Sequence, residues 1–217
     1  MGGWTSDIAL WYRGCIEHHA YHGDHYADGT PIPIGDPAAG ALDIIETQAY
    51  RLAPGNNENN VPQYGYRYNW YAMMNGASIT DGFHGNVQGV CPSGWHMPSY
   101  QEWQQLITYV SGQSEYCCGS NSSIVKALAA AEGWNSSSTP CSPGYNASTN
   151  NATGFTAMPS GYLGGIGSGV NFWSSTADSY YDSGCYHFGM TYSSTAFLPF
   201  GNAGNYGNVY AFVRCVH

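Results

Sequence analysis

Glycine and proline interrupt this sequence along its whole length, which limits how long any regular element can be. The 217 residues include 29 glycines and 11 prolines. Both residue types disfavour the interior of helices and strands, because glycine loses much conformational entropy on folding and proline lacks a backbone N–H. Only three stretches keep a helical spacing of apolar residues. We therefore expect one core-forming domain built largely of short strands and long loops.

The strongest local signal is a capping box ahead of an apolar helical face. Ser99 can accept a hydrogen bond from the backbone N–H of Glu102, while the Glu102 carboxylate reaches back to the first turn. Apolar residues follow at the i, i+3, i+4 and i+7 spacing of one helix face, namely Trp103, Leu106, Ile107 and Val110. The pattern predicts a helix over residues 99–111.

Two weaker helical patterns lie on either side of it. The first begins at the capping residues Thr5 and Ser6 and ends near Gly23. The second covers residues 123–132, with Gly133 as the glycine that follows a helix end.

The C-terminal half of the chain alternates loops with strand patterns. Residues 136–172 are rich in Ser, Asn, Gly and Thr, and we interpret them as long loops held in place by isolated aromatic residues. Alternating apolar and polar residues then predict strands of an antiparallel sheet at 171–175, 185–192 and 210–216.

The charge balance excludes several partners. Five basic residues against 14 acidic ones leave a net charge of −9, and the basic residues are scattered. Neither nucleic acid nor an anionic membrane surface is expected to bind such a chain. No apolar run reaches the length of a transmembrane helix, so we expect no membrane insertion. The N-terminus lacks the pattern of a signal peptide, and we expect either a mature chain or another export route.

Seven cysteines indicate disulfide bonds formed in an oxidising environment. None of them lies in a C-x-x-C pair, which argues against a zinc finger or a thioredoxin-type site. Cys117 and Cys118 are neighbours and do not easily bond to each other, and the odd number leaves at least one thiol over. These arguments leave the connectivity open.

One group of residues has metal-binding types in close sequence: His18, His19, His22, Asp24, His25 and Asp28. It lacks both a His-Glu-x-x-His motif and the ligand spacing of a calcium loop. We interpret these histidines as solvated or pocket-lining, and expect no metal and no cofactor. The glycines at 165–170 do not fit a dinucleotide-binding loop, and no serine lies in a Gly-x-Ser-x-Gly elbow. We therefore expect no enzymatic activity.

Six blocks along the chain, taken together and in order, closely resemble the Fibrobacter succinogenes major paralogous domain. They are Tyr26-Ala-Asp-Gly-Thr-Pro-Ile-Pro33, Tyr64-Gly-Tyr-Arg-Tyr-Asn-Trp-Tyr-Ala72, Gly89-Val-Cys-Pro-Ser-Gly-Trp-His-Met-Pro-Ser99, Gly154-Phe-Thr-Ala-Met-Pro159, Phe172-Trp-Ser-Ser-Thr176 and Val213-Arg-Cys-Val216. The resemblance implies a C-type lectin-like fold of the α+β class, with a small antiparallel sheet, two main helices and long loops. It further implies a domain over 26–217. The arm or helix over 1–25, which we expect to pack on this domain, has no counterpart in the family and is our interpretation of the sequence pattern alone. Because Cys91 and Cys215 both lie in these blocks, the resemblance favours a disulfide between them.

The same resemblance implies a function. Such domains occur in surface and secreted proteins of gut and rumen bacteria, and related sequences are the variable proteins of diversity-generating retroelements. In those systems the segment after the Phe-Trp-Ser-Ser-Thr block is rewritten, so that the scaffold displays a changing surface. We therefore expect a ligand-binding, receptor-recognition protein without chemistry. It would lie outside the cell, on a cell surface or a virion, and bind an unknown protein or glycan.

The corresponding surface in this chain is expected within residues 177–208. Their mixture of Tyr, Ser, Gly and Asn is typical of antibody-like binding surfaces, because tyrosine offers a large rigid contact area at little entropic cost. We predict eleven exposed contacts: Tyr180, Asp182, Tyr186, His187, Tyr192, Ser194, Phe197, Phe200, Asn202, Asn205 and Tyr206. Trp173, Phe188 and Val213 are predicted to be scaffold.

Two alternatives stay open. The first is a bacterial surface adhesin or carbohydrate-binding module with a fixed sequence. The second is an enzyme on the fold of the formylglycine-generating enzymes, whose Leu-Pro-x-x-x-Glu-Trp segment is similar to residues 97–103 here. The Glu-Pro-Asn and Trp-Asn-Asp motifs of animal C-type lectins are absent, which argues against calcium-dependent sugar binding.

Overall fold

The computed structural model describes residues 23–35, 48–77, 87–119, 123–161, 164–178, 184–201 and 209–217. Its elements are short, as the glycine and proline content predicts. The longest described helix is α4 (Tyr100–Ser111) and the longest described strand is β3 (Gly169–Asp178). The others are β1 (Arg51–Leu52), α2 (Val61–Tyr64), β2 (Arg67–Tyr68), α3 (Trp70–Met74), α5 (Val125–Leu128), β4 (Gly184–Thr191), β5 (Leu198–Gly201) and the single 3₁₀ turns 54–56, 58–60, 114–116 and 147–149.

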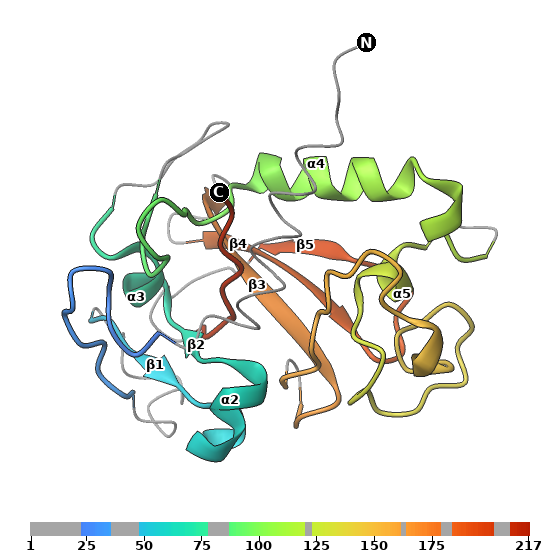
Figure 1. The fold of residues 1–217 in the computed structure, drawn as a ribbon, viewed down its shortest axis with the longest axis horizontal. Helices are drawn as coiled ribbons and strands as arrows, with labels where there is room; N and C mark the ends of the chain where they lie inside the picture. Colours follow the sequence, from blue (N-terminus) through green and yellow to red (C-terminus); the bar gives the residue numbers. More distant parts are fainter. Residues whose placement is uncertain are drawn as a thin grey trace, which may run out of the picture.

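A three-stranded antiparallel sheet forms the centre of the molecule (Figure 1). Its order is β3-β4-β5, and Phe172 lies opposite Phe188 while Trp173 lies opposite His187. Strands β1 and β2 form a separate two-stranded antiparallel pair. The combination of helices with small antiparallel sheets confirms the α+β class.

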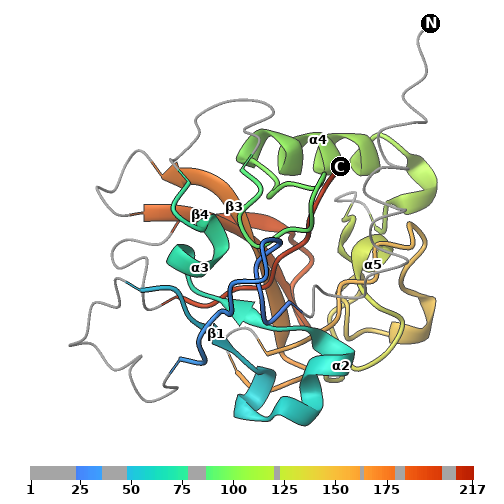
Figure 2. The same cartoon turned by 60° about the vertical axis from the view of Figure 1, so that its left-hand side comes forward.

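Helix α4 covers one face of the central sheet (Figures 1 and 2). Trp103 on this helix is fully buried and stacks on Phe188, with ring centroids 5.3 Å apart, and on Phe172, at 5.7 Å. Leu106 and Val110 extend the same apolar cluster. The helical spacing predicted from the sequence is therefore the spacing that packs against the sheet.

The opposite face of the sheet carries a second apolar cluster. Trp173 and Cys185 lie there, against the segment that contains β2 and α3. Because successive side chains of a strand point to opposite faces, the neighbours Phe172 and Trp173 enter different clusters. Burial on both faces explains why two large aromatic residues follow each other in this strand.

The helix predictions have three outcomes. The helix at 99–111 is confirmed as α4, including both hydrogen bonds of the capping box. The helix at 123–132 is wrong in length, because α5 is a single turn that ends at Leu128. There the chain turns away to pair with another loop: Ala129 bridges Ala157, and the Ala130 N–H donates to the Ala157 carbonyl at 2.9 Å. The helix between Thr5 and Gly23 lies outside the described residues except for its last position.

The strand prediction at 171–175 is confirmed within β3, and the one at 185–192 is confirmed as β4 except for its last residue, because β4 ends at Thr191. The third, at 210–216, is wrong as a continuous strand. Its residues pair with three separate partners in isolated bridges: Ala211 with Tyr68, Phe212 with Phe172 and Val216 with His96. The segment ties distant parts of the fold together instead of joining one sheet. Strand β5 was not predicted.

The loop over 136–161 is held partly by a lysine. The Lys126 ammonium group donates to the carbonyl oxygens of Tyr145 and Asn146, at 2.6 and 3.2 Å, and to Oδ1 of Asn150, at 2.6 Å. Burial lowers the pKa of Lys126. Phe155 adds an apolar anchor, since its side chain is buried in the cluster beneath α4. The prediction of loops pinned by aromatic residues holds here, with polar bonds added.

Two disulfide bridges join described residues. Cys91 bonds to Cys215, as the family resemblance implied, and Cys118 bonds to Cys141. Cys117 does not bond to its neighbour, and its thiol lies near the Ser111 carbonyl. Within the described ranges, no helix has the length and apolar character needed to cross a bilayer.

Candidate functional site

The residues predicted to form the binding surface separate into three groups. Tyr186, on β4, and Tyr192 and Ser194, just after it, are each partly exposed. Phe200 lies on β5 opposite His187, and its side chain is not described. Five of the predicted residues lie outside the described ranges: Tyr180, Asp182, Asn202, Asn205 and Tyr206.

Two residues of the predicted surface are buried, so the expectation that they are exposed is wrong. His187 is 1% exposed and lies opposite Trp173, because odd-numbered residues of β4 face the second apolar cluster. Phe197 is 6% exposed and packs near Trp103, with ring centroids 5.8 Å apart. Burial of Trp173, Phe188 and Val213 agrees with their prediction as scaffold.

Burial also changes the chemistry of His187. Desolvation lowers its pKa from 6.5 to about 4, because the charged imidazolium would lose its hydration inside the fold. The ring is therefore neutral at physiological pH. Such a group is poorly suited to be an interchangeable contact.

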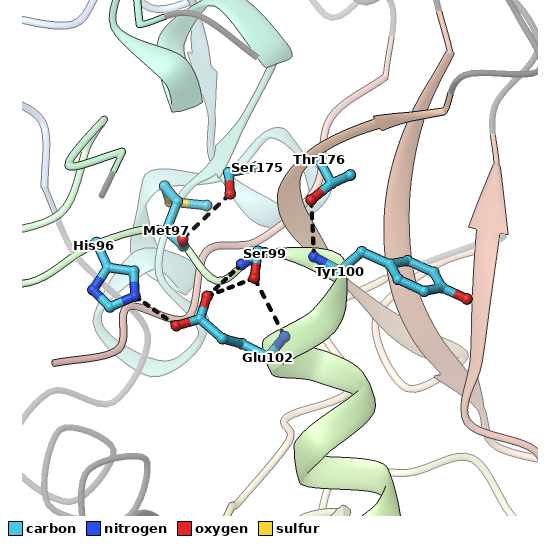
Figure 3. A network of polar contacts seen from close by, with 7 residues as sticks. All are labelled: His96, Met97, Ser99, Tyr100, Glu102, Ser175 and Thr176. Carbon is cyan, nitrogen blue, oxygen red and sulfur yellow. Dashed lines mark hydrogen bonds and ion pairs between the residues drawn. The ribbon is translucent and has the colours of Figure 1, made fainter. Parts of the chain in front are cut away.

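A tyrosine outside the predicted segment adjoins the surface. The rings of Tyr100, at the start of α4, and Tyr186 lie 4.7 Å apart, and Tyr100 also contacts the Phe188 ring at 5.4 Å. Figure 3 shows the Tyr100 ring extending away from Glu102 toward the strands. Tyr100 was not predicted as a surface residue, because its place beside Tyr186 depends on contacts with residues that are distant in the sequence.

The start of α4 is fixed by a saturated polar network around Glu102 (Figure 3). One carboxylate oxygen accepts from the Ser99 backbone N–H at 2.7 Å and from the Ser99 hydroxyl at 2.8 Å. The other lies 2.8 Å from Nε2 of His96. Burial alone would raise the pKa of Glu102, but the bonds from His96 and Ser99 outweigh it and lower the pKa. Together these bonds hold the first turn of α4 in place.

The Phe-Trp-Ser-Ser-Thr block contacts this helix start directly. Strand β3 is irregular after Trp173, and three residues bulge out of register with β4. In the bulge, the Ser175 N–H donates to the Pro98 carbonyl at 2.9 Å, and the Ser175 hydroxyl contacts the Met97 carbonyl. The Thr176 hydroxyl accepts from the Tyr100 N–H at 3.0 Å (Figure 3). The bulge thereby locks the sheet to α4.

The C-terminal block closes the same assembly. Cys215 bonds to Cys91, and Val216 pairs with His96 just ahead of α4, so that the chain end lies near the start of this helix (Figure 1). Arg214 is buried, with its guanidinium 4.3 Å from the Phe155 ring centroid and 5.5 Å from that of Phe172. It also donates to the Phe155 carbonyl at 2.9 Å. Ring faces and a carbonyl thus stabilise this buried cation.

Sequence blocks that resemble the family therefore contact one another around the central sheet. A comparison with known families identifies these blocks. The family model of the Fibrobacter succinogenes major domain matches residues 19–217. The chain belongs to this family. The match begins a few residues before the domain boundary that we predicted at residue 26. No curated protein and no solved structure matches the chain.

The histidine-rich stretch of this family member is described only from residue 23 onward. Nδ1 of His25 lies 2.6 Å from the Asp24 carboxylate, and both side chains are about half exposed. The hydrogen bond between His25 and the Asp24 carboxylate lowers the pKa of Asp24. Among the described residues, no three His, Cys, Asp or Glu side chains are grouped as metal ligands would be. His18, His19 and His22 lie outside the described ranges.

Proposed function

We propose that this protein is a ligand-binding protein on a C-type lectin-like scaffold, with its binding surface on residues 177–208, of which the described residue Tyr186 lies beside the start of α4. In its sharper form, it is the variable protein of a diversity-generating retroelement. It would act outside the cell, on a cell surface or virion, and bind a protein or glycan without catalysing a reaction.

This proposal rests on the difference between buried and solvent-accessible side chains along β4 and the residues just after it. Phe188 and Met190 point into the apolar cluster beneath α4 and are fixed by packing. Tyr186, Tyr192 and Ser194 keep solvent access on the same segment. A surface whose contacts can change needs such a separation, because substitutions at exposed positions cost little stability while core substitutions cost several kcal/mol.

The electrostatic and redox properties agree with this assignment. With a net charge of −9, the protein is suited to neutral or basic partners. Two disulfides favour an oxidising compartment such as the cell exterior. The polar groups near α4 that most resemble catalytic ones are His96 and Glu102. Glu102 bonds to both His96 and Ser99.

A paired substitution tests the surface. Wild-type protein is screened on arrays of glycans and cell-surface proteins, and a Tyr186→Ser/Ser194→Arg variant is screened in parallel. Tyr145→Ala is the matched control, because Tyr145 is 44% exposed and lies outside 177–208. We expect the array signal to fall at least about tenfold in the double variant alone, with its Tm within a few degrees of wild type. Equal signals in all three proteins would contradict the proposed surface.

Sequencing the locus tests the sharper form. A retroelement requires a near-copy of the codons for residues 172–217, mismatched at adenines and placed near a reverse transcriptase gene. Without such a copy, the segment is inherited unchanged and the protein is a fixed-sequence adhesin.

A further inference from the structure

A cavity of about 550 Å³ opens on the part of the molecule built by the N-terminal described segment and α3. Three segments line it: residues 26–28, residues 74–77 at the end of α3, and residues 87–89. None of them belongs to the surface proposed above. Its volume lies within the range of about 300–1,000 Å³ that is usual for small-molecule sites.

The walls of this cavity are fixed by backbone contacts. Gly89 has φ +53°, and a Cβ placed on it would lie 1.9 Å from the Met73 carbonyl oxygen. This close approach lets the Val90 N–H donate to the same carbonyl at 3.1 Å. The Met97 N–H donates to the Val87 carbonyl at 2.8 Å, so this wall is tied to the Cys91–Cys215 region. The cavity therefore exists before any ligand binds.

The third wall is fixed by Tyr26. Its hydroxyl donates to the Ala72 carbonyl at 3.2 Å, and its side chain is buried. Burial, and then the nearby Asp28 charge, raise the pKa of Tyr26 to about 12, so the hydroxyl stays neutral. The ring provides an apolar surface beside Met74 and Val87.

Among the described lining residues, the polar side chains are two amides and one carboxylate. Asn75 and Gln88 provide donors and acceptors, and Asp28 provides an acceptor. A bond from the Thr30 N–H, 2.9 Å long, lowers the pKa of Asp28, so its carboxylate is ionised at neutral pH. No lysine or arginine is among the described lining residues.

This composition selects among ligand classes. An anion would meet Asp28 and a protein of net charge −9, with no cationic group among the described residues of the lining. A cation would gain little, because Asp28 is fully exposed and its charge is screened by solvent. Neutral hydroxyl groups, in contrast, can donate to carboxylate and amide oxygens and accept from amide N–H groups.

We propose that this cavity is a second binding site, which takes a small neutral polyhydroxylated ligand of the mono- or disaccharide class. The site is separate from the surface on 177–208 and does not depend on its diversification. Because the cavity is open to solvent and the ligand is small, dissociation constants in the millimolar range are expected.

Titration of ¹⁵N-labelled protein tests the proposal. The probes are glucose, galactose, mannose, cellobiose, lactose and maltose, with sodium sulfate and tetramethylammonium chloride as charged comparisons. We expect at least one saccharide to shift the amide resonances of residues 75–77 and 87–89 with a saturable Kd of about 10 mM or tighter. Saturation by no saccharide, or tighter binding of a charged probe, would overturn the proposal.

Two variants in the cavity and one control variant elsewhere locate the binding. Ala27→Trp places a large ring in the cavity from an exposed lining position, and Ala152→Trp makes the same change at an exposed position elsewhere. Asn75→Gly removes an amide while keeping the left-handed conformation that Asn75 adopts at φ +49°. We expect Kd to rise at least about tenfold in Ala27→Trp and about threefold in Asn75→Gly, and to stay within about twofold in Ala152→Trp. Equal affinities in all three would place the ligand elsewhere.

The Tyr186→Ser/Ser194→Arg variant distinguishes this site from the proposed surface. We expect it to keep the saccharide shifts unchanged. Loss of these shifts would mean that both ligands use one surface, and would overturn the second site.

Discussion

The indole N–H of Trp173 donates a 2.7 Å hydrogen bond to the backbone carbonyl of Tyr68, 105 residues earlier in the chain. The same carbonyl accepts a second bond from the Ala211 N–H, at 3.1 Å. A single carbonyl thus joins β2, β3 and the C-terminal segment. The tryptophan of the Phe-Trp-Ser-Ser-Thr block is therefore required for a specific polar bond as well as for its size.

Trp173→Phe removes this donor and leaves unfilled volume in the second apolar cluster. We expect the free energy of unfolding to fall by about 2–4 kcal/mol, measured by urea denaturation. Trp95→Phe is the control, because Trp95 is only partly buried and its ring contacts His217. Trp95→Phe should lower the free energy of unfolding by less than about 1 kcal/mol. Equal decreases in the two variants would contradict the role given to the Trp173 hydrogen bond.

Ser99→Ala tests the start of α4. The change removes an acceptor for the Glu102 N–H and a donor to its carboxylate. Because Ser99 is fully buried, we expect a loss near the upper end of the capping range, about 2 kcal/mol. Ser111→Ala, at the exposed far end of the helix, should change stability by less than about 0.5 kcal/mol. A comparable loss at both ends would argue against the cap as a fixed point.

The buried His187 predicts instability in acid. Its pKa is about 4 in the folded protein and 6.5 ordinarily, so the unfolded chain binds a proton that the folded chain excludes between these values. Stability should therefore decrease as the pH falls from about 6.5 to about 4, by up to about 3 kcal/mol. His187→Gln should flatten this part of the pH profile. An unaltered slope in His187→Gln would show that other groups cause the pH dependence.

Glu102 acts in a lower pH range. Because its folded pKa is lowered, its contribution is complete above the ordinary value of 4.5 and is lost as the pH falls through the folded value. The two residues therefore contribute to acid unfolding in succession, His187 first.

The two disulfides are expected to differ in their contribution. Loop-closure entropy predicts a loss of about 5 kcal/mol for Cys91→Ala/Cys215→Ala and about 3 kcal/mol for Cys118→Ala/Cys141→Ala, because they close loops of 124 and 23 residues. Urea unfolding of the two double variants measures the difference. A larger loss from the shorter loop would mean that local packing outweighs chain entropy.

Gly89→Ala tests the wall of the cavity. A methyl group there would collide with the Met73 carbonyl, and the residue would also have to keep a positive φ, so we expect a loss of several kcal/mol. Gly29→Ala is the matched control, since Gly29 has φ +86° but open space around it. Its cost should be about 1 kcal/mol, measured by thermal unfolding. Similar costs would show that φ alone, and not the close approach, constrains Gly89.

The sequence predicted some of the candidate surface and missed the rest for identifiable reasons. The composition of 177–208 indicates tyrosines suited to binding, but the direction of each side chain depends on the register with β3. Trp173 opposite His187 sets that register, which turns His187 inward. Tyr100 joins the surface only because the bulge at 174–176 docks on the helix start. The cavity had no sequence signal, because its lining comes from three separate segments.

What the sequence determined by itself is local. A capping box and an apolar spacing fix α4, since both depend on contacts within a few residues of one another. Glycines and prolines keep the other elements short, and alternation marks β3 and β4. The tertiary structure decided where α5 ends, how residues 210–216 are divided among three partners, and which side chains of β4 face solvent. Those outcomes depend on hydrogen bonds and packing between residues that are far apart in the chain, and such contacts leave no periodic pattern in the sequence.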